Sequence, residues 1–327
     1  MCGRGRQNYA PAALFETARR DAGAGSTWKG QEKYKPTENL CPGKHAAVVV
    51  QAKNDGTPPQ LQTKRWGLVA AFDKSLNPDF WRMFNARSET LHTSPVFRRL
   101  LCSRRCAVPF DGFWEWTDDE MKAAKAAKQP WYVHRKAKGE PLWLAGLYDR
   151  RDPLGPGGSV DCDGKVYEEP ELETFTLVTM DVDKKLAWLH DRQPVILDTA
   201  GLAAWLAPPP GGEEEDEEEG SNAETPKRPS PAAGSSSSGG SAPSNAVVLA
   251  ALKSRVPCDE LQWHPTTKKV SKLDYQEGDA ALPVKLPSQQ QKSVASFFTK
   301  RPKPEEEAAC SASSPSTEPV VKHARRE

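Results

Sequence analysis

The most reactive combination of residues stands at the start of the chain, which reads Met1-Cys2-Gly3-Arg4. Methionine aminopeptidase is expected to remove Met1, because the side chain that follows it is small. The mature chain would then begin with Cys2, which carries an α-amine and a thiol on adjacent carbons. Both groups have a reactive fraction near neutral pH. Such an aminothiol condenses with an aldehyde to an imine, and its thiol then closes a thiazolidine ring.

Three further polar residues lie in segments that are otherwise apolar or tightly patterned. Glu115 stands between two tryptophans in Asp111-Gly112-Phe113-Trp114-Glu115-Trp116, and a carboxylate in such surroundings can act as a general acid or base. His190 opens His190-Asp191-Arg192-Gln193-Pro194. Asn85 precedes Arg87 and could hold a hydroxyl or a water. Each also has an ordinary structural interpretation, so none of them identifies a site alone.

Composition excludes several classes of protein. The chain has 327 residues, a formal net charge of +1 and seven cysteines at irregular spacing, so a disulfide framework is not expected. No apolar run is long enough to span a membrane. Cys102 and Cys106 have no second pair at metal-ligand spacing, and we expect neither a metal nor another cofactor. We expect a monomer without membrane association.

The pattern of short strands and few helices predicts a mixed, β-rich α/β domain over residues 2–284. Residues 208–245 combine an acidic run with Ser, Gly and Pro, which predicts a disordered insert, and residues 285–327 a disordered tail. Lysine-rich residues 183–190 are predicted to form a short helix, and residues 261–270 a late strand. Aromatic and basic residues alternate along the chain, as in a groove that contacts phosphates while bases stack.

Seven motifs occur in one order, and together they resemble the SRAP family of abasic-site-shielding proteins. They are Met1-Cys2-Gly3-Arg4, Asn39-Leu40-Cys41-Pro42-Gly43, Arg65-Trp66-Gly67-Leu68, Asn85-Ala86-Arg87-Ser88-Glu89-Thr90, Asp111-Gly112-Phe113-Trp114-Glu115-Trp116, His190-Asp191-Arg192-Gln193-Pro194 and Trp263-His264-Pro265. The resemblance covers residues 2–284 apart from the insert.

The resemblance implies one α/β domain with a β-barrel-like core and a basic groove for single-stranded DNA. It implies that Cys2 forms a thiazolidine with the C1′ aldehyde of an abasic deoxyribose. By the same resemblance Glu115 shuttles protons, His190 contacts the sugar or the adjacent phosphate and assists reversal, and Asn85 orients the terminal amine. The remaining residues implied to contact DNA are Arg4, Pro42, Trp66, Phe72, Arg87 and Arg192. Where family members often have Pro and Trp after the Trp-Gly motif, this chain reads Val69-Ala70-Ala71-Phe72.

The tail contains a second motif, Gln291-Lys292-Ser293-Val294-Ala295-Ser296-Phe297-Phe298. One 3₁₀ turn would bring Val294, Phe297 and Phe298 to the same side and leave Gln291 to form hydrogen bonds. The segment resembles a PIP box, the peptide that docks on the PCNA sliding clamp. We therefore expect a PCNA-type clamp as a second partner beside single-stranded DNA with abasic sites, and a location in the nucleus at replication forks.

Three alternatives remain open at this point. The chain could be an N-terminal-nucleophile glutamine amidotransferase, a class that also matures to a Cys-Gly start. Arg4 argues against that class, because an apolar residue is typical after the glycine. The chain could instead be a clamp-bound DNA reader in which Cys2 has no role, or a peptidase limited to release of its own terminal adduct.

Overall fold

The computed structural model describes residues 2–117, 128–152, 159–160, 166–167, 171–209 and 242–286. The chain divides into two compact units, Met1–Lys285 and Leu286–Glu327, and the described residues belong almost entirely to the first. The predicted clamp-binding segment 291–298 and most of the predicted insert lie outside the described ranges.

Five strands of the first unit close into a barrel. They are β4 (His45–Val50), β5 (Gln60–Trp66), β7 (Arg105–Phe110), β10 (Leu142–Arg151) and β13 (Leu172–Asp181). Their order is β13-β10-β7-β4-β5, and β5 returns to pair in parallel with β13 through Thr174 opposite Arg65 and Phe175 opposite Trp66. The α/β class with a β-barrel-like core is therefore confirmed.

Short strands extend this barrel. β6 (Asn85–Arg87) runs parallel along β13, and β14 (Arg192–Pro194) pairs antiparallel with its carboxyl end. β15 (Ile196–Leu197) pairs with β10, and β2 (Trp28–Lys29) with β5. β11 (Ser159–Val160) and β12 (Val166–Tyr167) pair with each other. Because β6 and β14 both adjoin β13, Asn85 and the segment that carries His190 come to the same end of the barrel.

A second sheet contains the amino-terminal strand. Its order is β16 (Leu261–Pro265), β9 (Pro130–Arg135), β8 (Gly112–Trp116), β1 (Gly5–Gln7) and β3 (Thr37–Leu40). A single residue, Asp111, separates β7 of the barrel from β8 of this sheet. The chain therefore passes directly from the barrel wall to the strand that carries Glu115.

The barrel wall is apolar on both faces, which explains the continuous apolar run in β4. Ala47 and Val49 pack with the helices, whereas Ala46, Val48 and Val50 pack with Cys2 and the second sheet.

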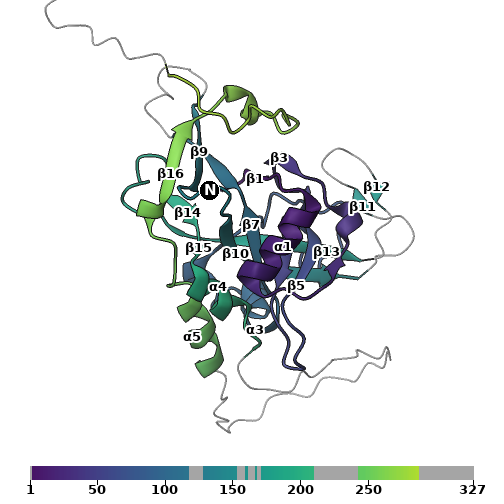
Figure 1. Cartoon of the computed structure of the whole chain (residues 1–327). Coiled ribbons are helices and arrows are strands. Elements are labelled where there is room, and N and C mark those ends of the chain that lie inside the picture. Colours follow the sequence, from purple (N-terminus) through teal and green to yellow (C-terminus); the bar gives the residue numbers. More distant parts are fainter. Residues whose placement is uncertain are drawn as a thin grey trace, which may run out of the picture. The chain divides into compact units, whose positions relative to one another are not determined.

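The helices are α1 (Pro11–Ala22), α2 (Pro95–Arg98), α3 (Leu100–Ser103), α4 (Thr199–Leu206) and α5 (Ala242–Ala251). Figure 1 shows α1 lying across the barrel strands and β16 beside β9.

Short 3₁₀ turns complete the described elements at Gln31–Lys33, Ser88–Thr90, Cys258–Glu260 and Lys268–Ser271. Within the described residues, no helix is both long and apolar enough to span a membrane.

Three predicted boundaries differ in the structure. Residues 183–190 form successive turns rather than a helix, with the N–H of Leu186 bonded to the carbonyl of Asp183 and that of Leu189 to Leu186. The predicted helix was wrong because β13 and β14 pair at Asp181 and Arg192, which leaves a loop too tight for a regular helix. The late strand ends at Pro265 and continues as a 3₁₀ turn, and α5 begins at Ala242, inside the predicted insert.

Gly5 is a position where the packing of β1 requires glycine. A Cβ added there would lie 2.1 Å from Cε2 of Phe110, and that ring is fully buried with its centroid 5.9 Å from the Trp66 ring. The Phe110 ring therefore has no free space to move into.

We predict that Gly5→Ala lowers the free energy of unfolding by about 1–3 kcal/mol, as expected for overpacking a dense core. Urea denaturation measures the effect. The matched control is Gly278→Ala, where an added Cβ meets no atom within 4 Å. Equal stability of the two variants would contradict the role assigned to Gly5.

Candidate active site

The amino-terminal strand is held between two neighbours by backbone hydrogen bonds. In β1, Gly5 pairs with Leu40 of β3 and with Phe113 of β8. The ladder continues beyond the strand, because the N–H of Trp114 donates to the carbonyl of Arg4 (3.0 Å). Continuing this antiparallel register by one step places Gly3 opposite Glu115. The sheet thus brings the first residues of the chain alongside the carboxylate.

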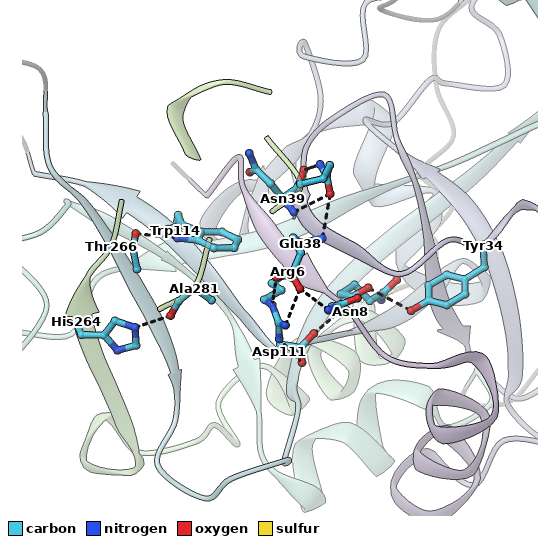
Figure 2. A network of polar contacts seen from close by, with 12 residues as sticks. Arg6, Asn8, Tyr34, Glu38, Asn39, Asp111, Trp114, His264, Thr266 and Ala281 are labelled. Carbon is cyan, nitrogen blue, oxygen red and sulfur yellow. Dashed lines mark hydrogen bonds and ion pairs between the residues drawn. The ribbon is translucent and has the colours of Figure 1, made fainter. Parts of the chain in front are cut away.

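Two polar side chains of β1 anchor it to the surrounding elements. Gln7 is buried and bridges the barrel, donating to the carbonyls of Ala47 and Pro109 (both 2.9 Å) and accepting from the N–H of Ala47 (2.8 Å). Figure 2 shows Arg6 between two carboxylates, Glu38 at 2.6 Å and Asp111 at 3.1 Å. Burial raises the pKa of Asp111, and the N–H of Asn8 offsets part of that effect by donating to it.

Arg4 joins the amino-terminal strand to the far end of the domain. Its guanidinium donates to Oδ1 of Asn39 (3.0 Å) and to the carbonyls of Val270 (2.7 Å) and Ser271 (3.0 Å). The side chain is 9% exposed and stands over the Trp116 ring at 5.6 Å. The sequence predicted a phosphate contact for Arg4, but its described bonds are directed to the protein interior.

Cys2 is 1% exposed and packs in the apolar cluster that includes Leu40, Trp66 and Phe110. Burial raises the pKa of its thiol well above the ordinary value, and the negative charge of Glu115 raises it further. Because the charge of Glu115 acts on the Cys2 thiol, the carboxylate and the thiol share one local environment. The thiol is therefore held in its protonated form at neutral pH and needs a base to become a strong nucleophile.

Glu115 and His190 form a pair beside this thiol. Glu115 is 6% exposed, and its Oε1 lies 3.3 Å from Nε2 of His190. The backbone N–H of Arg192 donates to Nδ1 of His190 (3.0 Å), which leaves the ring proton on Nε2, facing Glu115. Asp191 Oδ1 also lies 2.5 Å from Nδ1, a contact that forms a hydrogen bond only when Nδ1 carries a proton. We assign the ring proton to Nε2, because the backbone donor at Nδ1 belongs to β14 whereas the Asp191 side chain is 83% exposed.

Asn85 is the third predicted catalytic residue that the fold brings to Cys2. Its amide nitrogen donates to the carbonyl of Cys2 (3.0 Å). Its Oδ1 is buried and accepts no hydrogen bond from the described residues. An oxygen in that position can accept a hydrogen bond from an amine or a hydroxyl. Cys2, Asn85, Glu115 and His190 thus come together from four separate segments, as the sequence predicted.

The predicted DNA-binding arginines on the barrel differ from each other. Arg87 ends β6 two residues after Asn85 and is exposed. Arg192 instead pairs with Glu89 through two contacts of 3.0 and 2.9 Å and with Asp181. The hydrogen bonds that it donates lower the pKa of Glu89 to about 2, and its charge adds to this effect. Arg87 is therefore the better-placed arginine for a phosphate, and Arg192 holds the loop that carries His190.

Three more predicted DNA contacts have distinct positions. Trp66 is fully buried, stacked on Phe175 and bonded through Nε1 to the carbonyl of Phe84 (3.0 Å), so it has no surface for a base. Pro42 is buried in the turn before Gly43, whose N–H bonds to the Trp66 carbonyl (2.8 Å). Phe72 is 66% exposed. Phe72 therefore remains a surface aromatic, whereas Trp66 supports the wall behind Cys2.

Sequence reasoning missed the residues that fix β1. No pattern identified Gln7 or Glu38, and Asn39 was named only as part of a motif without a role, because their partners lie on other elements and only the register reveals them. It also missed Trp188, an exposed tryptophan two residues before His190. Trp188 follows two lysines in the sequence, and this polar neighbourhood could have indicated that the tryptophan lies outside the core. No group of three or more possible metal ligands occurs among the described residues.

Comparison with known proteins agrees with this geometry. The family model described as SOS response associated peptidase (SRAP) matches residues 1–229. The chain belongs to the SRAP family. Abasic site processing protein YoaM of Bacillus subtilis is 32% identical over 54% of this chain and 68% of its own length. YobE from the same organism is 33% identical over 54% and 70%, and abasic site processing protein HMCES of Xenopus tropicalis is 28% identical over 61% and 63%.

Solved structures support the SRAP fold. A protein from Bacteroides thetaiotaomicron aligns with a TM-score of 0.57 at 18% identity, over 86% of this chain and all of that chain. A phage-related protein from Bordetella bronchiseptica aligns with a TM-score of 0.50 at 23% identity, over 82% and 95%. At these identities the likeness concerns the fold alone.

The raised pKa of Cys2 gives a testable expectation. Alkylation by iodoacetamide at pH 7 should be slow at Cys2 in the folded protein and should accelerate as the pH rises beyond the ordinary thiol range. Glu115→Gln removes a charge that raises the pKa, so the pKa falls, the thiolate fraction grows and labelling becomes several-fold faster at the same pH. Mass spectrometry of the amino-terminal peptide measures it.

The matched control is Glu140→Gln, because the Glu140 side chain is 53% exposed. That variant should label Cys2 at the wild-type rate. Labelling of Cys2 that is unchanged or slower in Glu115→Gln would show that the carboxylate does not control the thiol.

Proposed function

We propose that the chain captures abasic sites in single-stranded DNA through a covalent bond to Cys2. The observation that carries this proposal is the convergence of Asn85, Glu115 and His190 on a buried amino-terminal cysteine. Membership of the SRAP family and the names of its relatives, abasic site processing proteins, support DNA-lesion handling as the general role.

The proposed reaction joins Cys2 to the ring-opened deoxyribose and releases one water. The Cys2 α-amine, freed when Met1 is removed, adds to the C1′ aldehyde, and loss of water gives an imine. The thiol sulfur then adds to the imine carbon, and the thiol proton finishes on the nitrogen. The product is a thiazolidine that links protein and DNA.

The protein residues have separate tasks in this sequence. Glu115 receives the proton from the thiol or amine and returns it to the departing hydroxyl, since the thiol is protonated at rest. His190 faces the same carboxylate with its Nε2 proton and stabilises the carboxylate between transfers. Asn85 fixes the Cys2 carbonyl and thereby the direction of the adjacent amine.

The substrate class follows from the missing base. An abasic nucleotide offers no base edge, so recognition depends on the aldehyde and on contacts to phosphates and neighbouring bases. Arg87, exposed beside Asn85, is the candidate phosphate contact. A glutamine amidotransferase fits less well, because Arg4 is committed to Asn39 and to backbone carbonyls where that class has an apolar residue.

A denaturing gel tests the covalent step. Mature wild-type protein mixed with a single-stranded oligonucleotide that contains one abasic site should give a shifted band. Cys2→Ala and a form that retains Met1 should give none, and Glu115→Gln should form the band at least about tenfold more slowly. Cys102→Ala is the matched control and should behave as the wild type, because Gln51 and Arg105 donate to its backbone carbonyl, which the substitution keeps.

The absence of a shifted band with correctly processed protein would refute the covalent proposal. Release of ammonia from glutamine would support the amidotransferase instead. Binding of the oligonucleotide without a covalent band, at equal affinity in Cys2→Ala, would support a non-covalent DNA reader.

We further propose that the tail directs the protein to a PCNA-type clamp, and hence to replication forks in the nucleus. The support is the sequence of residues 291–298, with Gln291, Val294, Phe297 and Phe298 at PIP-box spacing. The segment lies outside the described residues, so the proposal rests on sequence alone.

The double variant Phe297→Ala/Phe298→Ala should lose most of its capture by immobilised clamp, because the aromatic pair supplies the apolar contact. Covalent labelling of DNA should remain at the wild-type rate. Lys300→Ala is the milder control and should weaken capture only slightly. Capture that is the same in the double variant and the wild type would refute the clamp proposal.

A further inference from the structure

An exposed tryptophan stands beside the candidate active site and has no role in the steps above. Trp188 is 45% exposed, although the two leucines that flank it, Leu186 and Leu189, are almost fully buried. These leucines anchor the turns of residues 183–190 and direct the segment between them outward. The large apolar ring is thus presented to solvent by a firmly packed loop.

Trp188 is held in place by other aromatic rings. Its ring meets that of Trp131 edge to face, with centroids 4.8 Å apart and planes at 81°. The Trp263 ring lies 6.5 Å away at 48°. An edge-to-face contact fixes the orientation of a ring while leaving part of its π surface uncovered. The three rings form an aromatic wall, defined here as Trp131, Trp188 and Trp263.

This wall is continuous with the catalytic residues. Trp131 of β9 is the cross-strand partner of Glu115 of β8. Trp188 is two residues from His190, whose Nε2 faces that same Glu115. The aromatic wall therefore adjoins Glu115 and His190, the proposed proton-transfer pair.

A hollow of about 520 Å³ opens at this position, lined by Asp181, Val182, Ala187, Trp188, Leu189, His190 and Asp191. These lining residues include an aromatic ring, aliphatic groups and two carboxylates, but no lysine or arginine. Asp181 is paired with Arg192, whereas the exposed carboxylate of Asp191 would repel a phosphate. An uncharged aromatic ring can stack on the tryptophan. The chemistry of the hollow favours a nucleobase over the DNA backbone.

We propose that Trp188 stacks on a nucleobase adjacent to the abasic site, and that the aromatic wall orients the lesion strand toward Cys2. The proposal rests on the proposed function, because the neighbouring nucleotide is joined to the sugar that Cys2 is proposed to capture. Stacking on an aromatic ring is tolerant of base identity, which suits a protein that meets lesions in any sequence.

Fluorescence of 2-aminopurine tests the stacking directly. The base analogue is placed on one side or the other of a tetrahydrofuran site, which lacks an aldehyde and therefore binds without reacting. Wild-type protein and Trp188→Phe should quench the fluorescence at one of the two positions, and Trp188→Ala should not. Leu282→Ala is the control, because it removes another exposed apolar side chain (57% exposed), and it should quench as the wild type does.

Reaction rates give a second readout at limiting DNA. Trp188→Ala should crosslink an ordinary abasic oligonucleotide at least about 5-fold more slowly than the wild type, as expected for one lost stacking contact. With both neighbouring bases removed from the oligonucleotide, wild type and Trp188→Ala should react at the same reduced rate.

The outcomes separate the two proposals. Crosslinking by the wild type with no quenching at either position, and no effect of Trp188→Ala, would overturn the stacking proposal and leave the covalent function intact. Such a result would indicate that Trp188 binds a protein instead. Quenching without any crosslinking of the aldehyde would support stacking and refute the covalent function.

Discussion

The site depends above all on the fixation of the first strand. A chain terminus ordinarily frays, because few contacts restrain it. Here β1 is paired on both sides, and Gln7 makes three buried hydrogen bonds to barrel strands. Each of these bonds satisfies a polar group that would otherwise be costly to bury. Without them Cys2 would lose its position relative to Glu115, and the remaining site residues would have nothing to act on.

Burial of Cys2 has two consequences for the reactivity of its thiol. It raises the pKa of the thiol and so suppresses unwanted alkylation or oxidation at rest. It also makes the thiol a poor nucleophile until a base accepts its proton. Glu115 lies in the same environment and is itself almost fully buried, so proton transfer over a short path can replace ionisation into solvent. This arrangement is consistent with the order of the proposed reaction, in which the amine attacks first and the thiol closes the ring second.

Much of this architecture could be predicted from the sequence, and the exceptions have physical causes. The pattern of short strands and few helices correctly indicated a β-rich α/β domain, and the motif order indicated the SRAP family. The helix predicted at 183–190 was wrong, because local propensity does not include the tight connection imposed by β13 and β14. The DNA contacts expected for Arg4 and Trp66 came from the resemblance to the family, and both side chains are buried in the structure.

Arg4 illustrates why the sequence did not show whether a side chain faces solvent or the protein interior. An arginine in a basic motif usually faces solvent, and burying its charge is costly unless several acceptors surround it. Asn39 and the carbonyls of residues 270 and 271 supply those acceptors, but they come from segments far apart in the sequence. The spacing of residues in the sequence does not show that these segments contact each other. The order of strands in the folded sheet does.

The two helices on either side of residues 210–241 are joined to each other. α4 begins directly after Asp198 and α5 ends shortly before Ser254, and the Ser254 hydroxyl donates to Asp198 (2.7 Å). Gly201 approaches the Ser254 carbonyl so closely that an added Cβ would lie 2.2 Å from it. These contacts fix the start of α4 to the residues that follow α5. The segment after α5 can then reach Arg4 in a constant position, so that residues from both ends of the domain hold Cys2 in place.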